Sequence, residues 1–113
     1  MKATAQIIVW NEKKQESHIE EVSLEKVLQA FKWYDETYPG NNFVPPGKRK
    51  PWTENRSYRW AVWYHDRFYP PKVIIGRALG GDKIFWGGNL SGQANAALRE
   101  LGFRVDPKPI SNT

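Results

Sequence analysis

The sequence has no cysteine, and it has only two histidines, His18 and His65. It therefore has no disulfide and no thiolate metal site, and two imidazoles are too few for a metal cluster without carboxylate ligands. No apolar run approaches about 18 residues, and residues 1–20 lack the basic start and apolar stretch of a secretory signal. We expect a soluble cytoplasmic protein with no membrane span and no bound metal.

Motifs for catalysis or cofactor binding are also missing. The stretches GRALGG and WGGNLSG match neither a P-loop nor a dinucleotide fingerprint. No cysteine or serine elbow accompanies His65 and Asp66, which are sequence neighbours and point apart in a strand. We predict a protein that is not an enzyme and binds no cofactor. A small enzyme that uses His65 stays an alternative.

What the chain does have is a core of moderate size and an uneven charge. Its 113 residues are 40% hydrophobic and 14% aromatic, with six tryptophans, which favours a single domain with one core. Residues 1–40 hold five Lys/Arg against seven Asp/Glu, whereas residues 41–113 hold twelve against five. A basic surface of this kind attracts polyanions, of which nucleic acid is the commonest. A basic, well-solvated domain without such a partner is the alternative.

Apolar spacing and turn residues predict an α+β fold, in which a small, mostly antiparallel sheet packs against two or three helices. Residues 1–105 form this single domain, and residues 106–113 (DPKPISNT) have the composition of a flexible tail or linker. The predicted elements are strands over 5–10, 57–64, 68–69, 84–86 and 103–105, and helices over 24–37, 71–79 and 92–101. Residues 11–17 and 40–57 are predicted as solvated turn and loop.

Specific residues set the ends of the predicted helices. Ser23 is a suitable N-cap for the first helix, and Pro70–Pro71 suits the first turn of the second because proline lacks the N–H that would go unpaired there. Ser91 is predicted to cap the last helix, and Gly102 to end it in a left-handed conformation. On the second helix Lys72, Gly76 and Arg77 are predicted to share an outer face.

Two segments are candidates for phosphate contacts. Lys48, Arg49 and Lys50 lie in the long loop beside Trp52, which is able to stack or wedge at a base, although a solubilising loop explains them equally well. The turn over 87–92 precedes a helix and exposes backbone N–H groups, which favours either a phosphate seat or a plain helix cap.

Amide and aromatic side chains are candidates for reading a base. Gln93 and Asn95 follow the turn over 87–92 and are of the type that contacts base edges. Trp60, Trp63, Tyr64 and Trp86 are candidates for a pocket that holds an extruded base, although some of them are also expected in the core.

Three stretches resemble a known family: VLQAFKWYDETYPG, YRWAVWYHDRFYPPKVIIGRALG and FWGGNLSGQANAALRELGFRV. They resemble the N-terminal domain that precedes HNH nuclease or McrB-type AAA+ motor domains in modification-dependent (type IV) restriction proteins of the McrA/McrB kind. The resemblance covers about residues 22–105. Its motifs are the Tyr69–Lys72 step, the Phe85–Gly88 turn and the Leu98–Phe103 helix end.

The resemblance implies a DNA-binding specificity module that reads modified, for example methylated, DNA in a restriction or defence system and delivers a separate nuclease or motor domain. We predict phosphate contacts from Lys48, Arg49, Lys50, Arg67, Lys72 and Arg77. We predict base readout or a base pocket from Trp60, Trp63, Trp86, Asn89, Ser91, Gln93 and Asn95. The alternative is a protein-interaction module of a small phage or defence-associated protein that binds an acidic surface.

Overall fold

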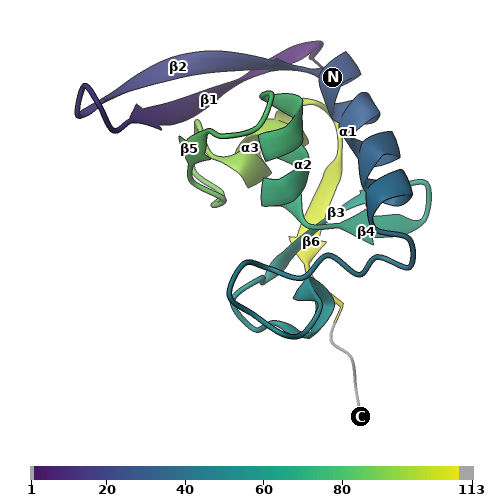
Figure 1. The fold of residues 1–113 in the computed structure, drawn as a ribbon. Coiled ribbons are helices and arrows are strands. Elements are labelled where there is room, and N and C mark those ends of the chain that lie inside the picture. The colour runs from purple at the N-terminus through teal and green to yellow at the C-terminus, as the bar shows by residue number, and fades with distance from the viewer. Residues whose placement is uncertain (1, 110–113) are drawn as a thin grey trace.

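The computed structural model describes residues 2–109 and arranges them in two antiparallel sheets and three helices (Figure 1). The elements in chain order are β1 (Thr4–Asn11), β2 (Glu16–Ser23), α1 (Leu24–Thr37), the 3-10 turn η1 (Trp52–Glu54), β3 (Trp60–Tyr64), β4 (Arg67–Tyr69), α2 (Pro71–Ala78), β5 (Ile84–Phe85), α3 (Ala94–Glu100) and β6 (Arg104–Pro107). The strand orders are β2-β1-β5 and β4-β3-β6. This is the predicted α+β class, with two sheets instead of one.

Helices α2 and α3 contact strands of both sheets, so the core lies between the sheets. Figure 1 shows the β1–β2 hairpin across the top of the molecule and the second sheet below the helices, with α1 along one side. The buried core includes Ile7, Val27, Phe31, Val62, Ile74, Ile75 and Leu98. None of the helices in residues 2–109 is long and apolar enough to span a bilayer.

Strand β1 is confirmed, but its partner β2 is missing from the sequence-based prediction. The turn is shorter in the structure than the predicted residues 11–17, because β2 begins at Glu16 and pairs antiparallel with all of β1. Only Val22 of its eight residues is buried, since β2 is the outer strand of the first sheet. An outer strand with so few buried residues has no apolar alternation for sequence reasoning to detect.

Helix α1 has the predicted limits. The Ser23 hydroxyl oxygen accepts a hydrogen bond from the N–H of Lys26 at 3.1 Å, as expected for an N-cap. Val27, Ala30, Phe31 and Tyr34 are buried at helical spacing and face α2 and the second sheet.

The second sheet contains the predicted hairpin. His65 and Asp66 both have positive φ values, 50° and 61°, as a two-residue type I′ turn requires. Strand β3 begins at Trp60, three residues later than predicted. Ala61 and Val62 are neighbours in β3 and are both fully buried, so both faces of the strand are covered near its middle.

The two later helices are confirmed, with one different cap. Pro71 opens α2, and Gly80 and Gly81 follow it with positive φ values. Helix α3 begins at Ala94, and Ser91 does not cap it. Gly102 has a φ of +96°, and the N–H of Phe103 donates to the carbonyl of Leu98 at 3.0 Å, which is the predicted helix stop.

The predicted tail begins too early. Asp106 and Pro107 belong to β6, which pairs with β3. The ammonium of Lys108 donates to the carbonyls of Trp52 and Asn55 at 2.8 and 2.7 Å. Residues 106–108 therefore belong to the fold, and the part of the predicted tail over 110–113 lies outside the described residues.

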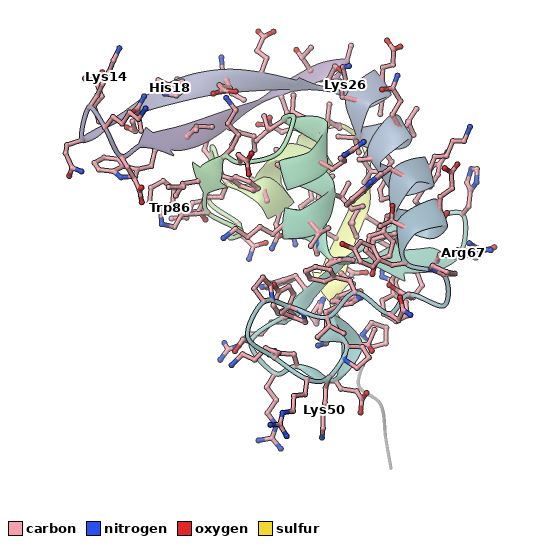
Figure 2. The ribbon with its side chains drawn as sticks, in the orientation of Figure 1. Lys14, His18, Lys26, Lys50, Arg67 and Trp86 are labelled. Atoms are coloured by element: carbon pink, nitrogen blue, oxygen red, sulfur yellow. The ribbon has the colours of Figure 1, made fainter. Side chains whose placement is uncertain are left out.

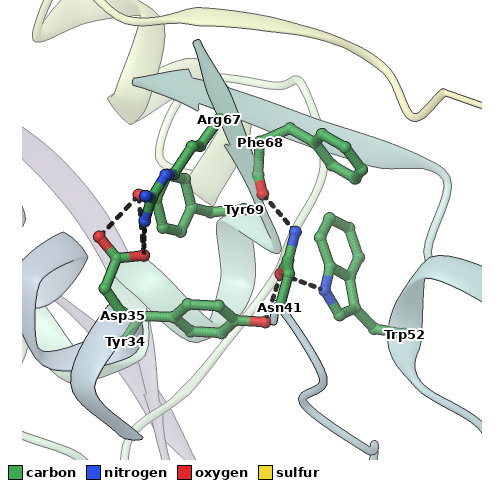
Figure 3. Close-up of polar contacts among 7 residues, drawn as sticks. All are labelled: Tyr34, Asp35, Asn41, Trp52, Arg67, Phe68 and Tyr69. Atoms are coloured by element: carbon green, nitrogen blue, oxygen red, sulfur yellow. Dashed lines mark hydrogen bonds and ion pairs between the residues drawn. The ribbon is translucent and has the colours of Figure 1, made fainter. Parts of the chain in front are cut away.

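The side chain of Asn41 holds the long loop against the second sheet (Figure 3). Its Oδ1 accepts hydrogen bonds from the Tyr34 hydroxyl at 2.7 Å and from Trp52 Nε1 at 2.9 Å. Its Nδ2 donates to the carbonyl of Phe68 at 2.8 Å. One amide thus joins α1, η1 and β4, and the basic loop leaves from this fixed point.

We predict that Asn41→Ala destabilises the fold by roughly 2–4 kcal/mol, because two donors and one carbonyl lose their partner at a partly buried place. The measurement is a urea unfolding curve, read as the free energy of unfolding at an unchanged m-value. Asn42→Ala is the control, since the Asn42 side chain is exposed. Equal stability of the two variants would contradict the role of Asn41.

Candidate nucleic-acid interface

The basic residues singled out from the sequence do not form one cluster. In Figure 2 Lys50 lies in the loop at the bottom, Arg67 at the right and Trp86 at the left beside β5. Lys48 and Arg49 are exposed next to Lys50. The structure therefore divides the predicted contacts among separate surfaces.

Arg67 lies on a surface that also carries negative charge. Its Nη1 is 3.5 Å from Asp35 Oδ1, and the Tyr69 hydroxyl donates to both carboxylate oxygens of Asp35 at 3.0 Å (Figure 3). Burial, followed by the hydrogen bond to Asp35, raises the pKa of Tyr69 to about 12, so its hydroxyl stays protonated at neutral pH. Asp35, Asp66 and Arg67 line one hollow on this surface. Two carboxylates make this hollow a poor place for phosphate.

The outer face of α2 that was predicted to carry Lys72, Gly76 and Arg77 is partly covered by Phe85. A Cβ added at Gly76 would lie 3.6 Å from the Phe85 ring, so Phe85 packs on the position that the sequence leaves bare. The close approach to Gly76 is thus made by the side chain of Phe85. Lys72 Nζ lies 5.6 Å from the centre of the Phe85 ring. Arg77 Cζ lies 4.7 Å from the centre of the Trp33 ring, and both of these residues line a hollow that does not include Lys72.

Two adjoining hollows bring together basic and aromatic side chains that the sequence analysis did not group in this way. The first, which we call the Trp60 hollow, measures about 400 Å³ and is lined among others by Trp60, Lys72, Gly87, Gly88 and Asn95. The second, which we call the Arg56 hollow, measures about 670 Å³ and is lined among others by Lys50, Glu54, Arg56 and Lys108. Both are also lined by Tyr58 and Arg59, which makes them neighbours.

The charge of these two hollows is strongly positive. Together they are lined by Lys50, Arg56, Arg59, Lys72 and Lys108, against the single carboxylate of Glu54. Tyr58 and Trp60 add aromatic surface between these cations. Such interleaving of aromatic rings and positive charge is typical of surfaces that bind single-stranded nucleic acid.

Three predicted residues meet in the Trp60 hollow: Trp60, Lys72 and Asn95. Sequence reasoning missed Tyr58 and Arg59 as site residues. The alternation of arginine with aromatic residues in RSYRW was the available signal. Arg56 and Lys108 were also missed, since only the fold brings residue 108 next to the loop.

At residues 87–92, where the sequence favours either a phosphate seat or a plain helix cap, several donors at the start of the helix have partners within the protein. The N–H of Leu90 donates to Gln93 Oε1 at 3.1 Å, and the N–H groups of Gln93, Ala94 and Asn95 donate to backbone carbonyls at 2.9 to 3.1 Å. These donors are already used within the protein, so they are not available to a phosphate. Ser91 is exposed on this turn.

The other predicted aromatic residues lie outside the two hollows. Trp52 is fully buried, so it does not stack or wedge at a base as its neighbourhood with Lys50 suggested. Tyr64 stacks on Phe31 with ring centres 4.6 Å apart. Trp63 packs on Phe68 and under Arg104, and Trp86 is 49% exposed.

The acidic N-terminal part contributes charge to a different surface. Glu20 on β2 contacts His18 Nε2 at 2.6 Å and Lys83 Nζ at 3.0 Å. The hydrogen bond from His18, together with Lys83, lowers the pKa of Glu20.

His65 is exposed and stacks on Tyr64 with ring centres 4.0 Å apart. Within residues 2–109 no group of three histidine or carboxylate side chains is placed to hold a metal.

Comparison of the chain with family models, with curated proteins and with solved structures finds no match. The fold and the two hollows define it as a small α+β domain with a basic, aromatic groove.

We predict that Lys108→Ala loosens the wall of the Arg56 hollow, because the carbonyls of Trp52 and Asn55 lose their ammonium donor. Trypsin is expected to cut after Lys48 or Arg49 faster than in the unchanged protein, and unfolding to cost roughly 1–2 kcal/mol less. Lys32→Ala on the exposed face of α1 is the control. Equal cleavage rates for both variants would contradict this anchoring.

Proposed function

We propose that the chain is a DNA-binding specificity module whose contact surface is the pair of adjoining hollows. The observation that carries the proposal is the meeting of five basic side chains, two aromatic side chains and one buried amide along a continuous path. Phosphates lie along the Arg56 hollow, where Lys50, Arg56 and Arg59 attract them without regard to sequence. The base of one nucleotide enters the Trp60 hollow.

The dimensions of the Trp60 hollow support a base and not a duplex as its occupant. A volume of about 400 Å³ falls within the range of roughly 300–1,000 Å³ that is typical of small-ligand pockets. Trp60 offers an aromatic face to the hollow. An unpaired base, single-stranded or extruded from a duplex, is therefore the ligand that this hollow accommodates.

We further propose that the module reads modified DNA in a restriction or defence system and delivers a nuclease or AAA+ motor domain. This finer proposal rests on the resemblance to McrA/McrB-type N-terminal domains. Two of its motifs line the Trp60 hollow, because Pro71 and Lys72 come from the Tyr69–Lys72 step and Gly87 and Gly88 from the Phe85–Gly88 turn.

A protein-interaction module is the second candidate, and a specific observation favours it. Ile19, Ile84, Trp86 and Leu90 are 60%, 44%, 49% and 72% exposed. Exposed large apolar residues in such number suit a protein partner. A domain that contacts both DNA and a partner protein uses the two surfaces separately.

We predict that Arg56→Gln and Arg59→Gln each weaken DNA binding several-fold and reduce the slope of log K against log salt by up to about 0.9, since each removes one phosphate contact. Glutamine keeps most of the side-chain stem. Arg67→Gln and Arg77→Gln are matched controls from the other hollows and are expected to leave affinity unchanged. Fluorescence anisotropy at several salt concentrations measures the effect.

If only the two control variants, Arg67→Gln and Arg77→Gln, lost affinity, the DNA would bind a different face from the one proposed. Absence of binding to single-stranded and duplex DNA at low salt would reject the DNA-binding proposal and leave the protein-interaction module.

The modification proposal has its own test. We expect matched duplexes with no modification, N6-methyladenine, 5-methylcytosine or 5-hydroxymethylcytosine to bind with different affinities, because an extruded base is read inside the Trp60 hollow. Equal affinity for all four would remove the reader function and leave general DNA binding. Trp60→Ala, whose ring lines the hollow, is expected to abolish any difference, whereas Trp33→Ala, which lies in another hollow, is expected to retain it.

A further inference from the structure

Strand β2 gives the first sheet a long open edge. Its eight residues pair with β1 on one side, and within residues 2–109 no other strand pairs with it. Figure 1 shows β2 at the top of the molecule. Proteins shield such edges with short strands, prolines, bulges or lysines, because open N–H and C=O groups pair readily with another chain. β2 contains no proline and no lysine, and residues 16–19 are exposed.

The pairing with β1 determines which backbone groups of β2 face outward. Opposite residues of an antiparallel pair either exchange both hydrogen bonds or direct their groups away from each other, in alternation. Ile8 lies opposite Ile19, and its N–H donates to the carbonyl of Gly92 at 2.9 Å, away from β2. Ile19 therefore directs its own N–H and C=O toward the open edge. By alternation, Ser17 and Glu21 do the same.

The sequence of β2 is complementary to itself when Ile19 lies opposite Ile19 of an antiparallel second copy. His18 then faces Glu20 of the second copy, and Ser17 faces Glu21. No glutamate faces another glutamate in this register.

Neighbouring registers lack this complementarity. Centring the pair on His18 places Glu16 opposite Glu20, and centring it on Glu20 places two copies of Glu20 face to face. Like charges directly opposite each other destabilise a strand pair. Charge therefore favours the register centred on Ile19.

The same register brings exposed apolar side chains together. Ile8 and Ile19 are 36% and 60% exposed, and they share one face of the sheet because they are directly opposite each other. Two copies would align four isoleucines across four strands, in the order Ile8, Ile19, Ile19, Ile8. Contact between them removes apolar surface from water, which favours association.

We infer that this chain forms a two-fold symmetric dimer in which β2 pairs antiparallel with β2 of a second copy, centred on Ile19. The two three-stranded sheets become one six-stranded sheet, and the same surface of both copies forms the interface. The inference is independent of the proposed function. Figure 2 shows His18 of β2 and Lys50 of the basic loop at opposite ends of the molecule, so the dimer leaves that loop accessible.

The first test measures mass by sedimentation equilibrium over a wide range of protein concentration. One chain has a mass of 13.1 kDa, and we expect twice this mass as the concentration rises. Ser17→Lys is expected to tighten the dimer several-fold, because each new lysine faces Glu21 of the other copy. Ser17→Glu is expected to weaken it several-fold, and Ser17→Glu combined with Glu21→Lys to restore it.

These charge changes act between chains and not within one. Ser17 and Glu21 are four residues apart in the same strand, about 14 Å, so they do not contact each other in the monomer. Thr37→Lys and Thr37→Glu, at the exposed end of α1, are the matched controls and are expected to leave the dimer unchanged.

The second test identifies the register by cross-linking. The sequence has no cysteine, so an introduced one is the sole thiol. Ile19→Cys is expected to give a covalent dimer on oxidation, because facing hydrogen-bonded residues have Cα atoms about 5.5 Å apart, which a disulfide spans. Glu21→Cys alone is expected to give none, since its two copies lie about 14 Å apart along the strands. A mixture of Glu21→Cys and Ser17→Cys is expected to cross-link.

Three results would overturn the inference. The first is a monomer at every concentration. The second is a dimer that Ser17→Lys and Ser17→Glu affect equally, because it would use another surface. The third is cross-linking of Glu21→Cys as fast as that of Ile19→Cys, because it would require another register.

Discussion

The side chain of Asn41 determines the place of the long loop, and the candidate site depends on that loop. Residues 40–57 contain no strand and no α-helix, so their position relative to the second sheet comes from a few contacts. The Asn41 amide supplies three of these, and Lys108 supplies two more from the opposite end of the chain. Together they place Trp52 in the interior and turn Lys50 and Arg56 toward the same hollow. A basic loop without these anchors would carry charge but would form no groove.

Local signals in the sequence were sufficient for the elements that begin or end at special residues. Ser23 caps α1, Pro71 opens α2, and Gly102 forms the stop that ends α3. Each of these residues acts on its own neighbours in the chain. β2 and the division into two sheets were not predictable in this way. Pairing of β5 with β1, and of β6 with β3, joins strands that are far apart in sequence, and no short pattern records that choice.

The same distinction applies to the candidate site. Residue type pointed to Trp60, Lys72 and Asn95, since an aromatic ring, a cation and an amide are what nucleotide recognition uses. Residue type also pointed to Arg67 and Arg77, which the fold pairs with Asp35 and with the Trp33 ring. Sequence supplied a set of suitable side chains, and tertiary structure decided which of them share a surface. The burial of Asn95 and its connection to residues 89 and 99 have no counterpart in composition or spacing.

The chain of contacts from Trp60 through Arg99 and Asn89 to Asn95 consists of one indole ring, one guanidinium and two amides. The amide group of an asparagine offers one acceptor and two donors, so its partners decide which way it points. The orientation of the Asn95 amide therefore follows from the places of Asn89 and Arg99, and a change at either residue reaches the buried Asn95 side chain.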